Sequence, residues 1–312
     1  MPPASERAKQ ILVLIPDRDS PFMTIASFAA TGNGSLTPKK LIGGERSALY
    51  GLPSTLFHAP GGRLFICSTK FSNRERSQHI LAFATTAHGD AAPVRDIGGS
   101  NNPLRNCTNL AIDRLERVVA TGREPDNTLF LWSPSLNGNA KPSQILSGDA
   151  TKLDNPRGLA FDKARELYAL NDGYPNHRPD TVTIYARNAS GNTAPIRMID
   201  GFDTQIEQPT AMAVSGEMIY VFNQGIPFET RPHVTAYETS QTGDVPPTIS
   251  ISGENTQLSK AEGLAVDAAG FIYVNNGVNQ ILVFAPGATG DAAPVQVITS
   301  DIHFFEGQIA VR

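Results

Sequence analysis

Residues 261–300 read Ala-Glu-Gly-Leu-Ala-Val-Asp-Ala-Ala-Gly-Phe-Ile-Tyr-Val-Asn-Asn-Gly-Val-Asn-Gln-Ile-Leu-Val-Phe-Ala-Pro-Gly-Ala-Thr-Gly-Asp-Ala-Ala-Pro-Val-Gln-Val-Ile-Thr-Ser. Four short apolar runs, rich in Val, Ile, Phe and Tyr, are separated by Gly, Asn, Asp or Pro, which is typical of strands joined by tight turns. The stretch therefore predicts strands over residues 263–266, 271–274, 280–284 and 294–298. One such unit cannot bury both of its faces, so it should recur along the chain.

The unit recurs, and a turn of the form Gly-(Asn/Asp)-x-x-Pro marks five copies, with a looser version over residues 32–38 in the sixth. Its prolines stand at positions 38, 93, 142, 195, 247 and 294, at intervals of 55, 49, 53, 52 and 47 residues. Gly and Asn or Asp tolerate positive φ, and Pro fixes φ where the outer strand begins. A second marker opens each copy: Tyr50-Gly51-Leu52, Thr108-Asn109-Leu110, Arg157-Gly158-Leu159, Thr210-Ala211-Met212, Glu262-Gly263-Leu264 and Glu306-Gly307-Gln308.

The sixth copy is divided between the two ends of the chain. Residues 307–312 supply one strand, and residues 11–15, 24–28 and 38–42 match the other three. Closure of this kind removes the exposed edges of a linear stack. The sequence therefore predicts an all-β, six-bladed β-propeller with four antiparallel strands per blade, the last blade combining three N-terminal strands with one C-terminal strand. We expect a single domain over residues 1–312, with residues 1–9 as a flexible lead-in.

Two short motifs carry a resemblance to a known family. Gly-Leu-Ala-x-Asp occurs at 158–162 and 263–267, and (Ile/Leu)-Tyr-(Val/Ala) at 167–169 and 272–274. This repeat resembles the NHL-repeat family and, more broadly, the six-bladed group that includes the gluconolactonase/SMP-30-like hydrolases. The resemblance covers nearly the whole chain. It implies the propeller fold, whereas one fold hosts many activities.

The hydrolase group also implies a divalent cation in the channel. Carried over by position, its metal-binding glutamate matches Glu262 or Glu306, and one of its asparagines matches Asn109 loosely. A Ca²⁺ or Mg²⁺ ion held there would be the cofactor. The other blades place Arg157, Thr210, Thr108 and Tyr50 at the corresponding positions, so the oxygen-rich set that Ca²⁺ prefers is incomplete.

Composition excludes several classes of protein. The net charge of −4 and the absence of a Lys/Arg block argue against nucleic-acid binding. No apolar run approaches the ~20 residues that span a membrane. The polar start of the chain lacks the features of a signal peptide, so we expect a cytoplasmic monomer. We interpret the two cysteines, Cys67 and Cys107, as buried thiols rather than a disulfide.

Loop length indicates which end of the ring carries function. With strands named A to D outward from the axis, the B–C loops and the start of each A strand share one face. The A–B turns are short and uniform, whereas the B–C loops at 67–77, 121–127, 171–180 and 223–233 differ in length and content. Long, diverse loops on a rigid scaffold usually carry binding sites, so we expect the site on the B–C face.

Two rings of side chains are expected to line the channel there and to bind a small molecule. The residues that open the A strands are Tyr50, Thr108, Arg157, Thr210, Glu262 and Glu306, with Asn109 beside them. The B strands end at Ser68, Thr121, Asn171, Asn223 and Asn276, and the loops add His177, Arg178, Arg231 and His233. The alternative for each asparagine is a hydrogen bond to the backbone, and for the loop arginines a local salt bridge.

Glu262 and Glu306 stand at equivalent places on neighbouring blades. Two adjacent carboxylates raise one pKa and can divide general-acid and general-base roles. Arg157, roughly across the channel, could hold an anionic group of the substrate. The alternative is a water-filled channel lined by solvated charges. No histidine pair has zinc-ligand spacing, and no nucleophile elbow or phosphate-binding loop occurs.

Two functions follow from these features. The first is an enzyme with hydrolase-like, lactonase-like or other acid–base chemistry on a polar or anionic small molecule. The second is a non-catalytic NHL-type interaction propeller that binds a protein partner through its B–C loops. Convergence of Glu262, Glu306 and Arg157 in a deep pocket favours the enzyme. Exposure of Tyr174, Ile226 and Phe228 favours the partner surface.

Overall fold

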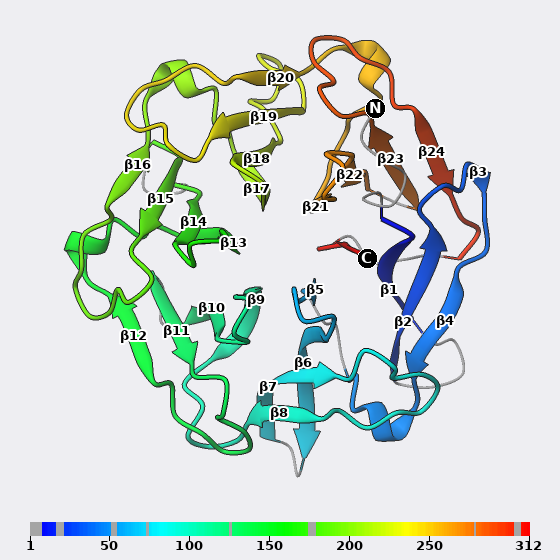
Figure 1. Ribbon diagram of the computed structural model, residues 1–312, viewed down its shortest axis with the longest axis vertical. Coiled ribbons are helices and arrows are strands. Elements are labelled where there is room, and N and C mark those ends of the chain that lie inside the picture. The colour runs from blue at the N-terminus through cyan, green and yellow to red at the C-terminus, as the bar shows by residue number, and fades with distance from the viewer. Residues whose placement is uncertain are drawn as a thin grey trace.

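The computed structural model describes residues 8–16, 22–50, 55–72, 75–124, 127–173, 179–277, 279–302 and 307–312. Within these ranges, six sheets of four antiparallel strands stand around a common axis, and the fifth has one added outer strand. Figure 1 shows the innermost strands β5, β9, β13, β17, β21 and β25 around an open centre. The predicted six-bladed propeller is therefore confirmed.

The strands of each blade run outward from the axis. Blades one to three contain β5 (Leu56–His58), β6 (Leu64–Ser72), β7 (Glu75–Phe83), β8 (Arg95–Gly98), β9 (Arg105–Ile112), β10 (Val118–Glu124), β11 (Thr128–Trp132), β12 (Gln144–Ser147), β13 (Pro156–Phe161), β14 (Leu167–Asn171), β15 (Thr181–Tyr185) and β16 (Arg197–Ile199). Blades four and five contain β17 (Pro209–Ser215), β18 (Met218–Asn223), β19 (His233–Glu238), β20 (Ile249–Ile251), β21 (Gly263–Val266), β22 (Ile272–Asn275), β23 (Gln280–Phe284) and β24 (Gln296–Thr299), and β3 (Gly34–Ser35) pairs parallel with β24.

Short 3-10 helices follow the outermost strand of four blades. They are η1 (Glu45–Ser47), η2 (Asp149–Thr151), η3 (Phe202–Thr204) and η4 (Glu254–Thr256). No helix within the described ranges has the length and apolar character needed to cross a membrane.

The closing blade joins the two ends of the chain, as predicted. Its strand order is β25 (Ala310–Val311), β1 (Gln10–Pro16), β2 (Met23–Ala29) and β4 (Lys39–Gly43). The expected flexible lead-in is too long by two residues. The backbone N–H of Ala8 donates to Asp267 Oδ2 at 2.9 Å, and that of Lys9 donates to the carbonyl of Arg312 at 2.6 Å. These bonds tie both residues to the ring.

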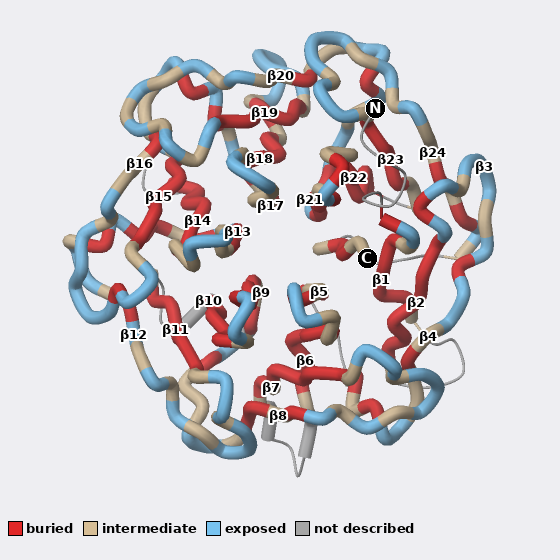
Figure 2. The backbone as a smooth tube through the Cα atoms, in the orientation of Figure 1, coloured by how far each residue is buried: buried red, intermediate tan, exposed pale blue. Residues whose placement is uncertain are grey.

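The hydrophobic core lies between the blades rather than at the axis. Each described interface between neighbouring blades holds its own cluster of buried apolar side chains. Figure 2 shows that burial follows the strands, whereas the outer connections are exposed. Because alternate residues of each strand face opposite neighbours, every blade is buried by the two beside it. This arrangement explains why the unit must repeat.

The interface between blades one and two contains a disulfide, so our expectation of two thiols is wrong. Cys67 in β6 and Cys107 in β9 are bonded, with their Cα atoms 6.0 Å apart. Both side chains point into the same buried interface, and their Cα separation lies within the range that a disulfide spans. The repeat placed the two cysteines on adjacent blades, but their separation of 40 residues did not show that the side chains face each other.

The Gly-(Asn/Asp)-x-x-Pro turn links each blade to the preceding one. In blade five, Gly290 has φ +62° and forms a bridge with Ile251 of blade four. The next residue, Asp291, accepts a hydrogen bond at Oδ1 from the backbone N–H of Asn255 at 2.7 Å. Equivalent side-chain links to the preceding blade are made by Asp90, Asn139, Asn192 and Asp244. The marker is therefore a contact between blades as well as a turn.

Blade one begins later than the Gly-Leu pair at 51–52 predicts. β5 starts at Leu56, whose register with β6 matches that of Leu110 with β10. Thr55, rather than Tyr50, therefore precedes the inner strand. Tyr50 lies before β5 and forms a bridge with Phe22 of the closing blade, with ring centroids 4.9 Å apart. A two-residue motif is too short to fix the register of a strand.

Candidate functional site

A pocket of about 720 Å³ opens on the B–C side of blades four and five. Its lining residues come from the start of β17, the β18–β19 loop and the segment before β21. They are Gln208, Thr210, Gln224, Gly225, Pro227, Phe228, Glu229, Thr230, Arg231, Pro232, Lys260 and Glu262. We call this cavity the loop pocket. Its volume lies within the ~300–1,000 Å³ of ordinary small-molecule sites.

Hydrogen bonds at its base hold the β18–β19 loop in place. The backbone N–H of Gln224 donates to the carbonyl of Gln208 at 3.2 Å, and that of Gly225 donates to the carbonyl of Glu207 at 3.3 Å. Further out, the Thr230 hydroxyl donates to a carboxylate oxygen of Glu207 and accepts from the backbone N–H of Ile226 at 2.6 Å. The loop is thus folded against the start of blade four, and the pocket has a defined wall.

The charges of the loop pocket are solvent-accessible and of both signs. Lys260 and Glu262 are exposed residues on either side of buried Ala261. Arg231 pairs with Glu254 at 2.8 Å, and these side chains remain 64% and 78% exposed. Such a rim pair contributes little stability, about 0–1 kcal/mol, so a ligand anion could compete for the guanidinium.

Thr210 and Gln224 connect the pocket wall to the neighbouring blade. The Thr210 hydroxyl donates to the carbonyl of Ala261 at 2.6 Å, and Gln224 Nε2 donates to the same carbonyl at 2.9 Å. Both side chains therefore lie between blades four and five, beside Glu262. Their remaining lone pairs can accept hydrogen bonds from a polar ligand.

Asp180, behind the loop pocket, has a perturbed carboxyl group. Burial raises its pKa, and the backbone N–H groups of Gly173 and Gln208, at 2.9 and 2.8 Å, act in the opposite direction. The negative charges of Asp172 and Glu207 add to the rise. Because Asp180 binds the backbone of Gln208, it positions one wall of the pocket.

The predicted asparagines are buried in hydrogen bonds with the scaffold. Asn171, Asn223 and Asn276 each accept at Oδ1 from a backbone N–H 16 or 17 residues earlier in the chain, at 2.7–3.1 Å. Asn171 and Asn223 also donate to Thr hydroxyls on the adjacent strand, and all three side chains are at most 5% exposed. This geometry supports the structural alternative for these residues.

Arg157 and Glu262 do not share the loop pocket. Arg157 is half exposed and pairs through Nε with Asp172 Oδ2 at 3.1 Å, within its own blade. Thr108 Oγ1 donates to the carbonyl of Thr121 at 3.5 Å, and Asn109 is a buried residue of β9. The expected arginine-carboxylate arrangement across the channel is therefore replaced by a local pair.

His233 is also part of the scaffold. Its Nδ1 lies 2.8 Å from the carbonyl of Arg231, its Nε2 lies 3.0 Å from the carbonyl of Gln205, and the residue is 5% exposed. The ring thus joins the end of the loop to the segment after η3. Glu306, His177 and Arg178 lie outside the described residues. Of the predicted site residues, Thr210, Arg231 and Glu262 meet in one pocket.

The described residues do not assemble the divalent-cation site that the family resemblance implies. Of the proposed donors, Asn109 is a buried residue of β9, Glu262 lines the loop pocket, and Glu306 lies outside the described residues. Across the described ranges, no three His, Cys, Asp or Glu side chains gather closely enough to hold a metal ion.

Comparison with known proteins supports the fold. No protein-family model matches the sequence, and no curated protein is significantly similar to it. A crystal structure of a protein from Lactobacillus plantarum has a TM-score of 0.58 at 12% identity, covering 98% of this chain and 100% of that chain. The WD40 β-propeller domain of Doa1 has a TM-score of 0.51 at 10% identity, covering 94% and 84%. This chain is a six-bladed β-propeller.

A third similar structure is the PQQ-bound aldose sugar dehydrogenase of Streptomyces coelicolor, with a TM-score of 0.49 at 14% identity, covering 96% of this chain and 91% of that chain. The identities of 12% and 10% limit the likeness of the first two structures to the fold, and the third adds no argument.

Sequence patterns missed part of the pocket. Lys260, Gln208 and Gln224 were not predicted, because each lies one or two residues outside the recurring motif positions. The length of the 223–233 loop was the one signal that pointed to this wall. Asp180 carried no signal at all, since its perturbed state depends on burial and on neighbours from two blades.

Proposed function

We propose that the protein binds a small polar or anionic molecule in the loop pocket and acts on it by acid–base chemistry. The observation that carries the proposal is the cavity of about 720 Å³, in which Glu262 faces the same space as Lys260, Arg231 and uncharged hydrogen-bonding side chains. Polar groups that converge on one cavity are the usual basis of a ligand site. Charges of both signs suit a ligand with hydroxyl and carboxylate groups.

The chemistry that fits this set is hydrolysis of a lactone or a similar ester. Glu262 would remove a proton from water as it adds to the carbonyl carbon, and would return the proton to the departing ring oxygen. Lys260 and Arg231 would balance the negative charge on the carbonyl oxygen. Glu306, as the predicted partner carboxylate, would complete the pair. The resemblance to lactonase-like propellers favours this reaction, and no step requires a metal ion.

A ligand panel tests the proposal. We would measure thermal unfolding with gluconate, glucono-1,5-lactone and inorganic phosphate, for wild type, the double variant Lys260→Ala/Arg231→Ala and the control Glu238→Gln. Glu238 is exposed at the other end of blade four. At 100 times the Kd, a ligand should stabilise wild type and the control by about 2.7 kcal/mol, and the double variant by much less.

The same panel separates binding from catalysis. Glu262→Gln should still bind glucono-1,5-lactone, while lactone hydrolysis above the spontaneous rate disappears. If no compound shifts the melting temperature of wild type, or if the double variant responds equally, the pocket proposal is wrong. If the ligands bind and hydrolysis is unaffected by Glu262→Gln, the site binds without the proposed chemistry.

A protein-binding function is the second candidate. Phe228, at the tip of the β18–β19 loop, is fully exposed and adopts a φ of +68°, an unusual conformation for a bulky residue. Exposed aromatic residues on loops often serve as anchors for a partner. Phe228→Ser should abolish binding to a partner chain, whereas Glu262→Gln should leave that binding intact while it removes lactone hydrolysis. The two variants together distinguish the two functions.

The disulfide indicates the redox conditions of the compartment in which the protein resides. Structural disulfides persist mainly in oxidising compartments, whereas the cytosol keeps thiols reduced. The Cys67–Cys107 bond therefore favours an oxidising compartment over the expected cytoplasmic location. Peptide mapping without reductant, on protein taken directly from its native source, decides between them.

A further inference from the structure

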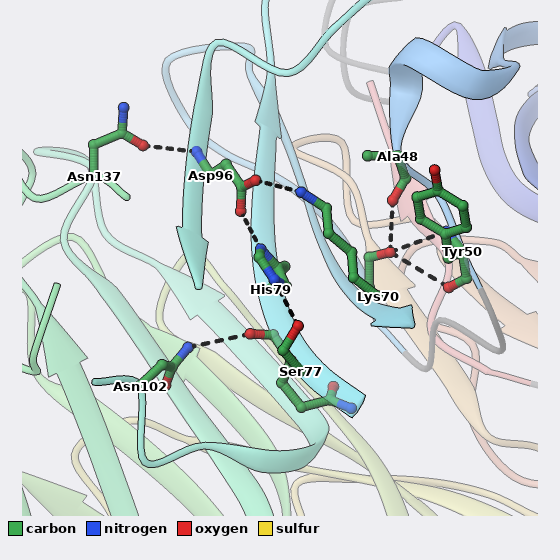
Figure 3. Close-up of polar contacts among 10 residues, drawn as sticks. Ala48, Tyr50, Lys70, Ser77, His79, Asp96, Asn102 and Asn137 are labelled. Carbon is green, nitrogen blue, oxygen red and sulfur yellow. Dashed lines mark hydrogen bonds and ion pairs between the residues drawn. The ribbon is translucent and has the colours of Figure 1, made fainter. Parts of the chain in front are cut away.

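Four polar side chains gather on one face of blade one, away from the loop pocket. They are Lys70 of β6, Ser77 and His79 of β7, and Asp96 of β8 (Figure 3). Residues two apart on a strand point to the same face, which places Ser77 beside His79. Lys70 stands directly opposite Ser77 in the register of β6 and β7. The sheet itself therefore brings these groups together.

The contacts form a continuous chain. Ser77 Oγ lies 3.0 Å from His79 Nε2, and His79 Nδ1 lies 2.5 Å from Asp96 Oδ1. When Nδ1 carries the proton and donates a hydrogen bond to the Asp96 carboxylate, Nε2 is free of a proton and accepts a hydrogen bond from the serine hydroxyl. A base that contacts the nucleophile on one side and an orienting carboxylate on the other is the geometry that activates serine.

Gly98 leaves space for the imidazole ring of His79. Gly98 stands opposite His79 in β8, and a Cβ atom there would lie 2.2 Å from His79 Nδ1. A side chain at position 98 would displace the ring from Asp96. The ring can lie over β8 and reach the carboxylate because this residue is glycine.

Asp96 is fixed from two further directions. Lys70 Nζ donates to Asp96 Oδ2 at 2.6 Å, and the backbone N–H of Asp96 donates to Asn137 Oδ1 at 2.7 Å. Burial by itself would raise the pKa of Asp96, but the hydrogen bonds and charges of His79 and Lys70 outweigh it and lower the pKa below its ordinary value. The carboxylate thus stays ionised beside the imidazole at neutral pH.

Access differs along the chain of contacts. The His79 side chain is 13% exposed, that of Asp96 is 33% exposed, and Ser77 is half-buried. Within the described residues, His79 is the side chain that Ser77 Oγ contacts. The serine is therefore partly exposed, with the imidazole as its hydrogen-bond partner.

From this geometry we propose that Ser77 and His79 form a second reactive site, which transfers the acyl group of small carboxylic esters to water. His79 Nε2 takes the proton of Ser77 Oγ as the oxygen bonds to the carbonyl carbon, and then gives it to the departing alkoxide as the C–O bond breaks. Water then attacks the carbonyl carbon of the acyl-serine. His79 Nε2 takes a proton from this water and gives it to Ser77 Oγ as the bond between the acyl group and the serine breaks. Asp96 and Lys70 are positioning residues.

A purely structural role for the four residues predicts a different result. In that case the four side chains only join three strands. Replacing them would lower the stability of the protein, and Ser77 would show no enhanced reactivity in wild type. Labelling by an alkyl fluorophosphonate separates the two roles, because Ser Oγ displaces fluoride only when a base removes its proton. Hydrolysis of p-nitrophenyl acetate provides a second readout.

Wild type should be labelled at Ser77, and Ser77→Ala and His79→Gln should lower labelling and ester hydrolysis at least tenfold. Asp96→Asn should slow labelling, because the carboxylate no longer holds the imidazole ring with Nε2 towards the serine hydroxyl. Ser240→Ala is the control, since Ser240 is an exposed serine whose hydroxyl contacts Glu238 and no histidine. Circular dichroism verifies that each variant is folded.

A thiol variant provides an independent measurement. Both native cysteines are in the disulfide, so Ser77→Cys would be the single free thiol. Its alkylation by iodoacetamide should be at least tenfold faster than that of Ser240→Cys, and His79→Gln should remove the difference. Acceleration that depends on His79 in either assay supports the proposal, and its absence in both overturns it. Fluorophosphonate labelling of Ser77 and alkylation at position 77 report on this site alone, so this result is separate from that of the loop pocket.

Discussion

The sulfur atoms of Cys67 in β6 and Cys107 in β9 are bonded to each other across the interface of blades one and two. These strands are not neighbours in a sheet, and the bond lies in a cluster of buried apolar side chains between the two blades. The bond therefore fastens one blade to the next near the middle of the ring. In a propeller, where each blade is stabilised by its neighbours, a link of this kind opposes opening of the ring.

We predict that the double variant Cys67→Ala/Cys107→Ala is folded but less stable. For a sequence separation of 40, closing the loop in the unfolded chain corresponds to about 3–4 kcal/mol. Urea unfolding of wild type with and without reductant, beside the double variant, measures this difference. Equal midpoints for all three would show that the bond contributes nothing.

The contact between Gly253 and Asp291 gives a second prediction. Gly253 precedes η4 with φ +138°, and a Cβ there would lie 2.2 Å from Asp291 Oδ1. Gly253→Ala should cost about 2–3 kcal/mol in the free energy of unfolding, because strain and a clash combine. Gly216→Ala, at φ +62° with open space around it, is the control and should cost about 1–2 kcal/mol.

A double-mutant cycle sharpens this test. Asp291→Ala removes the atoms that the new methyl group meets, so the Gly253→Ala/Asp291→Ala pair should be less destabilised than the sum of the single changes. Strict additivity would mean that the two residues do not contact each other in solution.

Asp96 gives a prediction on pH. Its pKa is lowered in the folded protein, so the ionised carboxyl stabilises the fold above its unfolded pKa of ~3.9, and this stabilisation is lost as pH falls through the folded value. The free energy of unfolding of wild type should exceed that of Asp96→Asn by about 1 kcal/mol at pH 7. This value is small because the Asp96 side chain is partly exposed.

The same difference should persist at pH 5 and shrink below about pH 4. Thermal unfolding between pH 3 and pH 7 measures it, with Asp301→Asn, an exposed carboxyl, as the control. A difference that grows as the pH falls would contradict the assigned direction.

The sequence predicted the architecture because its repeat contains residues with distinctive backbone preferences. Gly290 permits the positive φ of the turn, Pro294 restricts φ where the outer strand was expected to begin, and the strands 263–266 and 280–284 are confirmed at both ends. The strand predicted over residues 271–274 is shifted by one residue, since β22 runs over Ile272–Asn275. In blade one the described inner strand is Leu56–His58, whereas the predicted Gly51-Leu52 opening lies outside the described residues.

The site was harder to predict because it depends on loops. Arg157 was expected to lie across the channel from Glu262 and Glu306. It instead pairs with Asp172, which follows β14 in the same blade. The asparagines at strand ends resembled a ligand ring, yet they satisfy backbone groups. Repetition marks positions that every blade needs, so it finds scaffold residues first. A site built from one loop and one gap between blades does not repeat.

The central claim is that the loop pocket holds a polar or anionic ligand. A crystal structure of the protein soaked with gluconate tests it most directly. We predict that the ligand lies in the pocket, with its carboxylate within hydrogen-bond distance of Lys260 or Arg231 and its hydroxyl groups near Glu262 and Gln224. Density for gluconate only at the Arg157–Asp172 pair, or an empty pocket at saturating concentration, would contradict the account.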